Sequence, residues 1–168
     1  EFEHRDILNI SEDEILNMLT WKTGVLLQFA AQTGAIIGHN SPNYRLDSVR
    51  IAGEFALSAG LAFQLQDDIL GIYADKEEWG KPVGNDIRVR KVTLIIKKAL
   101  EMSRDEERAF LLTCLGNINL SNDDLIQVRK IIINCGALAA IEEMAKDCIK
   151  KAKESLYQLP DNHFRGLL

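Results

Sequence analysis

Long apolar runs, proline and cysteine are all scarce in this 168-residue sequence. No apolar run approaches the ~20 residues that a membrane-spanning helix needs, and no stretch resembles a signal peptide, so we expect no membrane span. The three cysteines, Cys114, Cys135 and Cys148, lack metal-ligand spacing, and their odd number favours free thiols in a reducing compartment. These absences argue against a disulfide-stabilised scaffold and favour a cytoplasmic protein.

Positive charge is also in short supply. The sequence has 20 Lys and Arg against 25 Asp and Glu, for a formal net charge of −5. We therefore expect no nucleic acid partner, although the balance does not exclude a local basic pocket. The hydrophobic share of 46% and charged share of 27% suit one domain with its own core, predicted over residues 1–168. The sequence begins at Glu1 without an initiator Met, which we interpret as a piece of a longer chain.

Helical periodicity covers most of the chain, and no segment shows convincing strand alternation, so the predicted fold class is all-α. Ser11 and Glu14 form a capping box, and Ser121 is the expected N-cap of a later helix. Gly38 and Pro160 are expected helix stops. The predicted helices cover residues 11–37, 44–73, 93–102, 105–115, 121–134 and 136–159, after an irregular segment at 1–10.

The most informative stretch is residues 60–71, inside the second predicted helix. At about 100° per residue, Gln64, Asp67 and Asp68 fall on one narrow polar arc, and the rest of the helix surface is almost entirely apolar. We expect such a helix to be buried, which leaves two adjacent carboxylates in the interior that need a cation. Asp oxygens suit Mg²⁺, whose coordination substrate phosphates usually complete. The alternative is an ordinary solvated helix face.

Lys22 lies at the centre of an apolar stripe in the first predicted helix. A Lys at such a position either extends along the face until its ammonium reaches water, or keeps its charge inside against an anion. Thr23 adds a hydroxyl at the next position. The stripe that we expect to be buried comprises Ile15, Met18, Leu19, Val25, Leu26, Phe29, Thr33 and Ile36.

Residues 74–92 form a predicted loop that contains Gly, Pro and Asn and carries four cations from Lys81 onward. Its order of residues is not that of a nucleotide P-loop. A glycine-bearing loop with fixed cations beside a metal site suits a phosphate-rich anion, although the same composition also occurs in plain surface loops. The cations are Lys81, Arg88, Arg90 and Lys91. Together, the carboxylate pair, Lys22 and this loop describe a magnesium–diphosphate site that faces an apolar cavity.

These segments resemble the second aspartate-rich region of trans-isoprenyl diphosphate synthases, the polyprenyl synthetase family. The resemblance is carried by residues 63–71 (FQLQDDILG), residues 80–88 (GKPVGNDIR), Lys91 with Thr93, and the upstream Lys22-Thr23-Gly24. It is strongest to the short-chain farnesyl and geranylgeranyl types. The resemblance covers the whole chain but only the C-terminal half of the family fold. The family's first aspartate-rich motif and isopentenyl diphosphate pocket lie upstream of what is matched.

The resemblance implies an isoprenoid synthase-type helical bundle, C-terminal portion, and a prenyltransferase that condenses an allylic diphosphate with isopentenyl diphosphate. By position, it implies that Asp67 and Asp68 hold Mg²⁺ and that Gln64 lines the same face. Lys22, Lys81 and Lys91 would neutralise the diphosphate, and Thr23 would donate a hydrogen bond to it. Asp86 and Arg88 would support the loop. The implied assembly is a homodimer, and this portion alone is expected to be inactive.

Three positions depart from the family pattern. Gly71 stands where a third carboxylate is common, which implies weaker metal binding through this motif. Val89 and Arg90 stand where the family usually has Glu-Gly, and Val92 takes a position that is often basic. The alternatives are a non-catalytic regulatory subunit of a heteromeric prenyl synthase, a terpene cyclase or head-to-head condensing enzyme, and a helical interaction domain without a small-molecule site. The sequence does not specify the product chain length.

Overall fold

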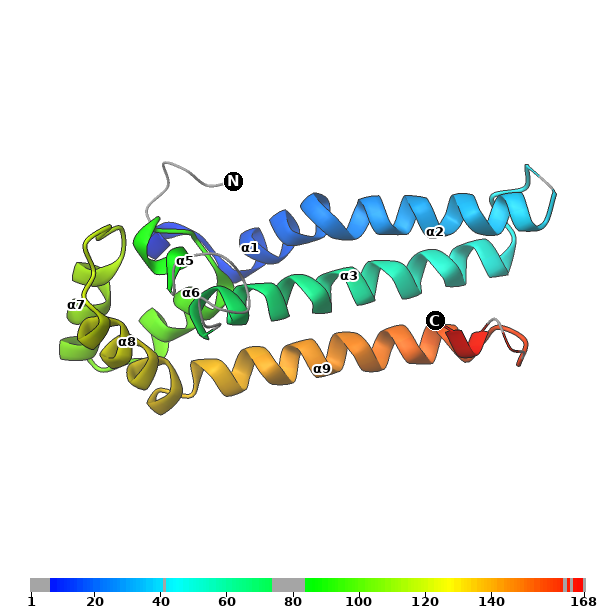
Figure 1. The fold of residues 1–168 in the computed structure, drawn as a ribbon. Helices are drawn as coiled ribbons and strands as arrows, with labels where there is room; N and C mark the ends of the chain where they lie inside the picture. The colour runs from blue at the N-terminus through cyan, green and yellow to red at the C-terminus, as the bar shows by residue number, and fades with distance from the viewer. Residues whose placement is uncertain (1–6, 41, 74–83, 162, 164, 168) are drawn as a thin grey trace. The chain divides into compact units, whose positions relative to one another are not determined.

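The computed structural model describes residues 7–40, 42–73, 84–161, 163 and 165–167 (Figure 1). Every regular element in these ranges is helical, which confirms the predicted all-α class. None of the described helices is long and apolar enough to span a membrane. The elements are η1 (Ile7–Asn9), α1 (Glu12–Leu19), η2 (Thr20–Gly24), α2 (Val25–Gly38), α3 (Asp47–Tyr73), α5 (Asn85–Arg88), α6 (Leu94–Met102), α7 (Asp105–Cys114), α8 (Asn122–Asn134), α9 (Ala137–Leu156) and η3 (Arg165–Leu167).

The chain divides into two compact units. The first consists of residues 1–16 and 65–143, and the second of residues 17–64 and 144–168. The first unit therefore holds the end of α3 with α5, α6, α7 and α8, whereas the second holds α2 and most of α3. The single domain predicted over residues 1–168 stays a prediction.

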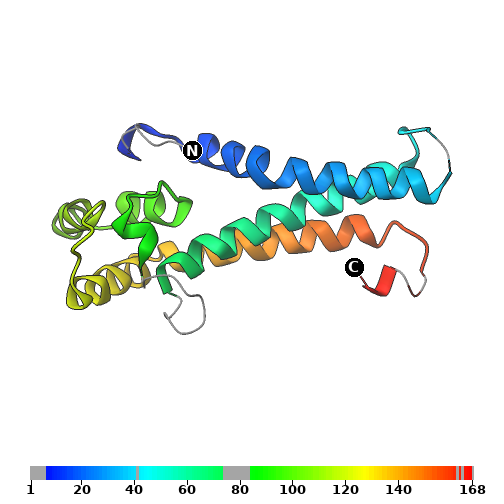
Figure 2. The same cartoon turned by 45° about the horizontal axis from the view of Figure 1, so that its top comes forward.

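Helix α6 forms the centre of the first unit. It packs against α7, α8 and η1, and both views of the ribbon place α6, α7 and α8 together (Figures 1 and 2). Its N-cap Thr93 is buried and accepts a hydrogen bond from the backbone N–H of Ile96 at 3.4 Å. The buried apolar residues of this helix are Leu94, Ile95, Ile96, Ala99 and Leu100.

The predicted helix caps are confirmed in detail. The backbone N–H of Glu14 donates to Oγ of Ser11 at 3.2 Å, and the N–H of Ser11 donates back to Oε2 of Glu14 at 3.0 Å. At the start of α8, Oγ of Ser121 accepts from the N–H of Asp124 at 3.0 Å. Each cap satisfies backbone donors that the first helical turn leaves without partners.

The first predicted helix is not continuous, because α1 and α2 are joined by a π-helical turn, η2. A π turn contains an extra residue, so every later side chain is rotated by about 100° from an unbroken α-helix. The stripe predicted for this helix is wrong beyond the turn also because α2 has no buried residue on any face. Leu26 and Phe29, both expected in the core, have exposed fractions of 67% and 65%.

Other boundaries shift by a few residues. Helix α3 begins at Asp47 and not at Tyr44, because the side chain of Asn43 accepts from the N–H of Arg45 at 3.1 Å and forms a turn there. Helix α9 ends at Leu156, short of the predicted Leu159. Two short helices, η1 and α5, occupy segments that the sequence analysis treats as irregular.

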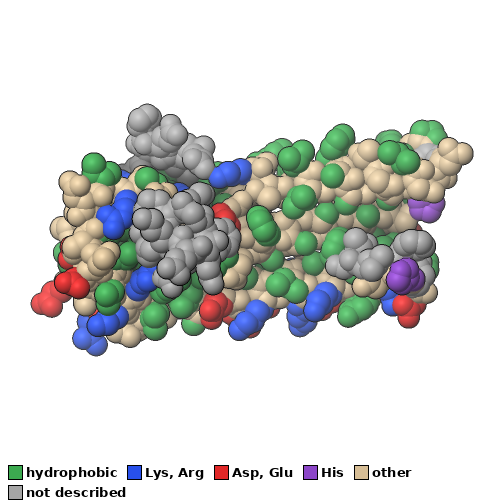
Figure 3. All heavy atoms as spheres, viewed as in Figure 1, with side chains coloured by type: hydrophobic (Ala, Val, Ile, Leu, Met, Phe, Trp, Pro, Cys, Tyr) green, Lys and Arg blue, Asp and Glu red, His purple; other side chains and the backbone are tan. Residues whose placement is uncertain are grey.

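In the second unit, glycines let α2 and α3 lie close together (Figures 1 and 2). A Cβ at Gly24 would lie 2.9 Å from Cδ1 of Leu57, and one at Gly60 would lie 2.9 Å from Cδ1 of Leu27. Despite this contact, α2 contains no buried residue. The large apolar side chains exposed on η2, α2 and α3 are Trp21, Leu26, Leu27, Phe29, Ile37 and Phe63, and Figure 3 shows green side chains along this part of the surface.

Candidate functional site

The two adjacent carboxylates of α3 have different environments. Asp68 is buried, with an exposed fraction of 1%, whereas the Asp67 side chain remains 39% exposed. Leu65 and Ile69 are buried, but Phe63, another apolar residue of this helix, is 67% exposed. The expectation of a helix buried all round is therefore wrong, and only one of the two carboxylates lies in the interior.

Lys91 supplies the cation that the buried carboxylate requires. Its Nζ donates to Oδ1 of Asp68 at 3.1 Å and to Oδ2 of Asp86 at 3.0 Å, and it lies 3.9 Å from Oδ2 of Asp67. The carboxylate pair and the cationic segment that follows it thus meet in the first unit. This arrangement brings three carboxylates around one ammonium.

The backbone around α5 holds Asp86 in this position. Gly84, with φ of 68°, precedes the helix in the left-handed region that glycine adopts without strain. After the helix, the N–H of Lys91 donates to the carbonyl of Asp86 at 2.9 Å. The guanidinium of Arg88 donates to the carbonyl of Ile118 at 3.1 Å. Arg88 therefore supports the loop, as the resemblance implies.

Arg90 follows in an unusual conformation, with φ of 53°. This is the position at which the resembled family usually has glycine. A residue with a Cβ in the left-handed region costs roughly 1–2 kcal/mol relative to glycine. Arg90 therefore keeps the left-handed backbone conformation that glycine adopts easily, at the expense of some strain. Val89 is 58% exposed and Val92 is half-buried. Neither contributes to the carboxylate–ammonium cluster.

Burial and charge shape the ionisation of the cluster. Desolvation raises the pKa of Asp68 from 3.8 to about 6, although the attraction of Lys91 opposes that rise. Burial lowers the pKa of Lys91, but the charges and hydrogen bonds of Asp68 and Asp86 outweigh it, so the pKa is raised overall. Near neutral pH both groups are charged. Oδ2 of Asp68 is buried without a hydrogen-bond partner, so one acceptor of this carboxylate is left unsatisfied in the metal-free structure.

We expect Asp68 to make the metal-free protein less stable as pH rises. Its folded pKa of about 6 exceeds the ordinary 3.8, so its stabilising contribution is complete below about pH 4 and is lost as pH rises through 6. Asp68→Asn should remove this contribution. Urea unfolding of both proteins at several pH values between 4 and 7 gives the free energy of unfolding as a function of pH, and this free energy should fall more steeply with pH in the wild type than in Asp68→Asn. The same pH dependence in both proteins would contradict the shifted pKa.

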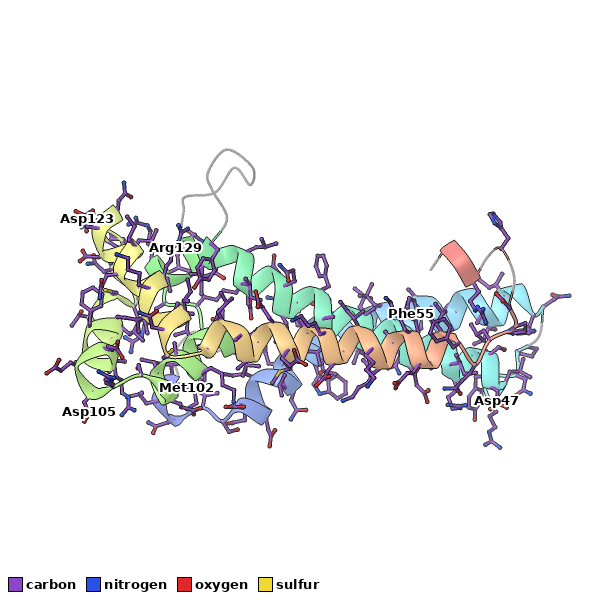
Figure 4. The ribbon with its side chains drawn as sticks, turned by 90° about the horizontal axis from the view of Figure 1, so that it is seen from below. Asp47, Phe55, Met102, Asp105, Asp123 and Arg129 are labelled. Carbon is purple, nitrogen blue, oxygen red and sulfur yellow. The ribbon has the colours of Figure 1, made fainter. Side chains whose placement is uncertain are left out.

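Arg129 of α8 anchors the end of the carboxylate-bearing helix, as Figure 4 indicates. Its Nε and Nη2 donate to the carbonyl of Ile72 at 2.9 and 2.7 Å, and its guanidinium lies 5.6 Å from the ring centroid of Tyr73. The sequence analysis missed this residue. The sequence pattern that could have revealed it is the spacing of Arg129 four positions after Leu125, which places this cation on the buried face of α8.

The remaining predicted site residues belong to the second unit or lie outside the described residues. The hydroxyl of Thr23 donates to Oε1 of Gln64 at 2.7 Å, and Gln64 is buried. Lys22, in the π turn, is exposed. Its predicted cavity, shared with Asp67 and Asp68, stays a prediction. Lys81 and the rest of residues 80–83 fall outside the described residues.

The cluster has two features of a site for a hard cation such as Mg²⁺, but its present geometry is not that of a metal site. Asp68 offers a buried, unpartnered oxygen, and carboxylates are the ligands that Mg²⁺ prefers. Within the described part of the chain, however, no three acidic, His or Cys side chains are close enough together to hold a metal ion. The residues fit a divalent cation if the carboxylates close around it in place of the ammonium.

Comparison with known proteins adds independent information. A sequence model described as polyprenyl synthetase matches residues 1–132. The chain is similar to a geranylgeranyl diphosphate synthase of Sulfolobus acidocaldarius, with 36% identity over 159 residues, 95% of this chain and 47% of the relative. It thus spans about half the length of the curated relatives that it matches.

Two solved structures are similar in fold as well as in sequence. The geranylgeranyl pyrophosphate synthetase of Pyrococcus horikoshii has a TM-score of 0.80 and 32% identity, over 95% of this chain and 47% of its own. The polyprenyl synthase of Caulobacter crescentus, solved with calcium and isoprenyl diphosphate, has a TM-score of 0.83 and 32% identity, over 98% and 48%. The isoprenoid synthase-type bundle predicted from the sequence is thereby confirmed.

Proposed function

Because this chain belongs to the polyprenyl synthetase family, we propose that it functions in a prenyltransferase. The reaction condenses an allylic diphosphate with isopentenyl diphosphate to a short-chain isoprenyl diphosphate of the geranylgeranyl or farnesyl type. The observation that carries the proposal is the cluster of Asp67, Asp68 and Asp86 around the ammonium of Lys91. Relatives named as geranylgeranyl diphosphate synthases support it.

The proposed cofactor is Mg²⁺, held by Asp67 and Asp68. A structure neighbour that contains calcium and isoprenyl diphosphate supports a divalent cation in such a fold. When bound, the cation neutralises the charge that develops on the departing diphosphate. The buried acceptor of Asp68 supports its role as a ligand, and the partial exposure of Asp67 leaves it accessible from solvent.

The cations of the chain serve the diphosphate in this proposal. Lys91 and Lys81 follow the carboxylate-bearing helix, and Lys22 comes from the π turn upstream. Each would neutralise diphosphate oxygens by charge-assisted hydrogen bonds. Thr23 donates its single hydroxyl hydrogen to Gln64 in the structure, and in this proposal it donates that hydrogen to the diphosphate instead. Arg88 supports the loop from the carbonyl of Ile118.

The proposed partners are the two diphosphate substrates and a second copy of the enzyme, and the proposed location is the cytoplasm. The three cysteines are free, as expected for a reducing compartment. Among the described residues, no observation favours the alternatives of a regulatory subunit, a terpene cyclase or head-to-head condensing enzyme, or a plain helical interaction domain.

The function is tested by incubating the full-length protein with labelled isopentenyl diphosphate and an allylic diphosphate. We expect a longer isoprenyl diphosphate in the presence of Mg²⁺ and none after chelation.

Lys22→Met should leave thermal stability unchanged, because Lys22 is exposed, but should weaken the binding of inorganic pyrophosphate. Lys150→Met, at another exposed Lys, is the matched control. Normal pyrophosphate binding by Lys22→Met would contradict the proposed role of Lys22. Absence of any condensation product from the full-length protein would contradict the proposed prenyltransferase function.

A further inference from the structure

Gly71 and Asp86 occupy one small space in the first unit. A Cβ built on Gly71 would meet Oδ2 of Asp86 and would lie 2.7 Å from its Cγ. Real Cβ atoms essentially never approach another heavy atom so closely. The absence of a side chain at 71 is thus what allows the Asp86 carboxylate to lie against α3, one helical turn beyond Asp67.

Asp86 enters this space from a different element, and its position is well fixed. Its side chain is only 12% exposed, and its Oδ2 accepts from Nζ of Lys91 at 3.0 Å. The N–H of Gly116 donates to the carbonyl of Ile87 at 2.9 Å, which ties α5 to the loop before α8. A buried carboxylate that is held in place by its surroundings is suited to bind a cation with little reorganisation.

We propose that Asp86 supplies the third carboxylate of the cation site, from α5, at the place that Gly71 leaves open on α3. The proposal rests on the proposed function, which provides the divalent cation. Two observations support it independently of sequence pattern. The three carboxylates already surround one cation, the ammonium of Lys91, within 3.0–3.9 Å. In addition, the buried Oδ2 of Asp68 lacks a partner.

The ammonium of Lys91 lies between the carboxylates and keeps them too far apart to bind a metal ion. This explains why no group of three metal-binding side chains is found among the described residues. Ammonium hydrogen bonds are near 3 Å, whereas Mg²⁺ binds oxygen at about 2.1 Å. A divalent cation would therefore replace the ammonium of Lys91 between the carboxylates. Lys91 would then have its charge available for the diphosphate. Gly71 would not weaken the site, contrary to the expectation from sequence, because its carboxylate is supplied from elsewhere.

The first test measures metal affinity without turnover. Mn²⁺ binding to the full-length protein is followed by electron paramagnetic resonance in the presence of inorganic pyrophosphate. Asp86→Asn keeps the side-chain volume and should lower Mn²⁺ affinity by about tenfold or more. Asp105→Asn, whose side chain is fully exposed on α7, is the matched loss of one charge and should leave the affinity unchanged.

The second test moves the carboxylate. Gly71→Asp alone should lower thermal stability, because the new side chain collides with Asp86. The double variant Gly71→Asp with Asp86→Gly places the third carboxylate on α3 and should bind Mn²⁺ more tightly than Asp86→Gly alone. Restored affinity supports the shared place of the two side chains. Affinity as low as that of Asp86→Gly, in a double variant with a cooperative melting transition, overturns the proposal.

The third test separates a metal ligand from a residue that only positions Lys91. In a Lys91→Met background, a ligand at Asp86 still contributes, so adding Asp86→Asn should again lower Mn²⁺ affinity about tenfold. An unchanged affinity in that background overturns the proposal and leaves Asp86 as an anchor for Lys91. Normal Mn²⁺ binding by Asp86→Asn alongside loss in Asp67→Asn overturns this proposal alone. A wild-type protein that binds no Mn²⁺ contradicts the proposed function as well.

Discussion

Replacing Asp67 by Ala in the full-length enzyme should lower kcat by ~10²-fold or more, which corresponds to several kcal/mol of transition-state stabilisation. The reason is that charge develops on the diphosphate as its bond to the allylic carbon breaks, and the metal that neutralises this charge is held by few carboxylates. Asp67 is also the more exposed of the two adjacent carboxylates, and its Oδ2 lies 3.9 Å from Nζ of Lys91, the longest of the three carboxylate–ammonium distances. Its loss should therefore cost function more than folding.

Steady-state kinetics at saturating substrates, with thermal unfolding beside them, measures this effect. Asp123→Ala is a suitable control, because Asp123 is exposed in the first turn of α8 and lies outside the cluster (Figure 4). The control should keep normal turnover. Near-normal kcat in Asp67→Ala would remove Asp67 from the proposed metal ligands.

Expressed alone, residues 1–168 should show no condensation activity and should self-associate. The chain spans about half the length of its relatives, and Asp67 and Asp68 form the one aspartate-rich motif among the proposed metal ligands. Helix α2 buries none of its residues, and its neighbours expose further large apolar side chains. A contiguous apolar surface beyond a few hundred Å² tends to recruit a partner.

Sedimentation velocity and an isopentenyl-transfer assay decide this prediction. Phe29→Glu introduces a charge on the exposed face of α2 and should shift the protein toward monomer. Ile118→Glu, at a site 73% exposed in the first unit, is the matched control and should leave association unchanged. A monodisperse monomer that converts allylic substrate would show that residues 1–168 are not half of an enzyme.

Local signals in the sequence predicted much of the fold. The caps at Ser11 and Ser121 depend on contacts between residues three positions apart, so the motif itself specifies them. Helices α6 and α8 begin and end within a residue of the prediction, and the N-cap Ser121 accounts for the start of α8. Asp68 is buried as expected, but the expectation came from a helix buried all round, which the exposed Phe63 shows to be wrong.

The features that prediction missed depend on contacts between distant residues. The approach of Asp86 to Gly71 joins two elements, and a sequence pattern on α3 alone cannot reveal it. The anchor from Arg129 to Ile72 is likewise tertiary. The exposed Phe63 was expected in the interior because apolar periodicity cannot say whether a neighbouring element covers a face.

The π turn η2 contains one residue more than an α-helical turn would need. Deleting one residue from Thr20–Gly24 would therefore give an ordinary α-helical turn, and the side chains before and after it would keep nearly the same angular register. Inserting one residue into a regular helix instead rotates the side chains on one side of the insertion by about 100° relative to those on the other. A single-codon deletion in this segment should thus be tolerated far better than a single-codon insertion in the neighbouring α1, whose Ile15 and Leu19 are buried.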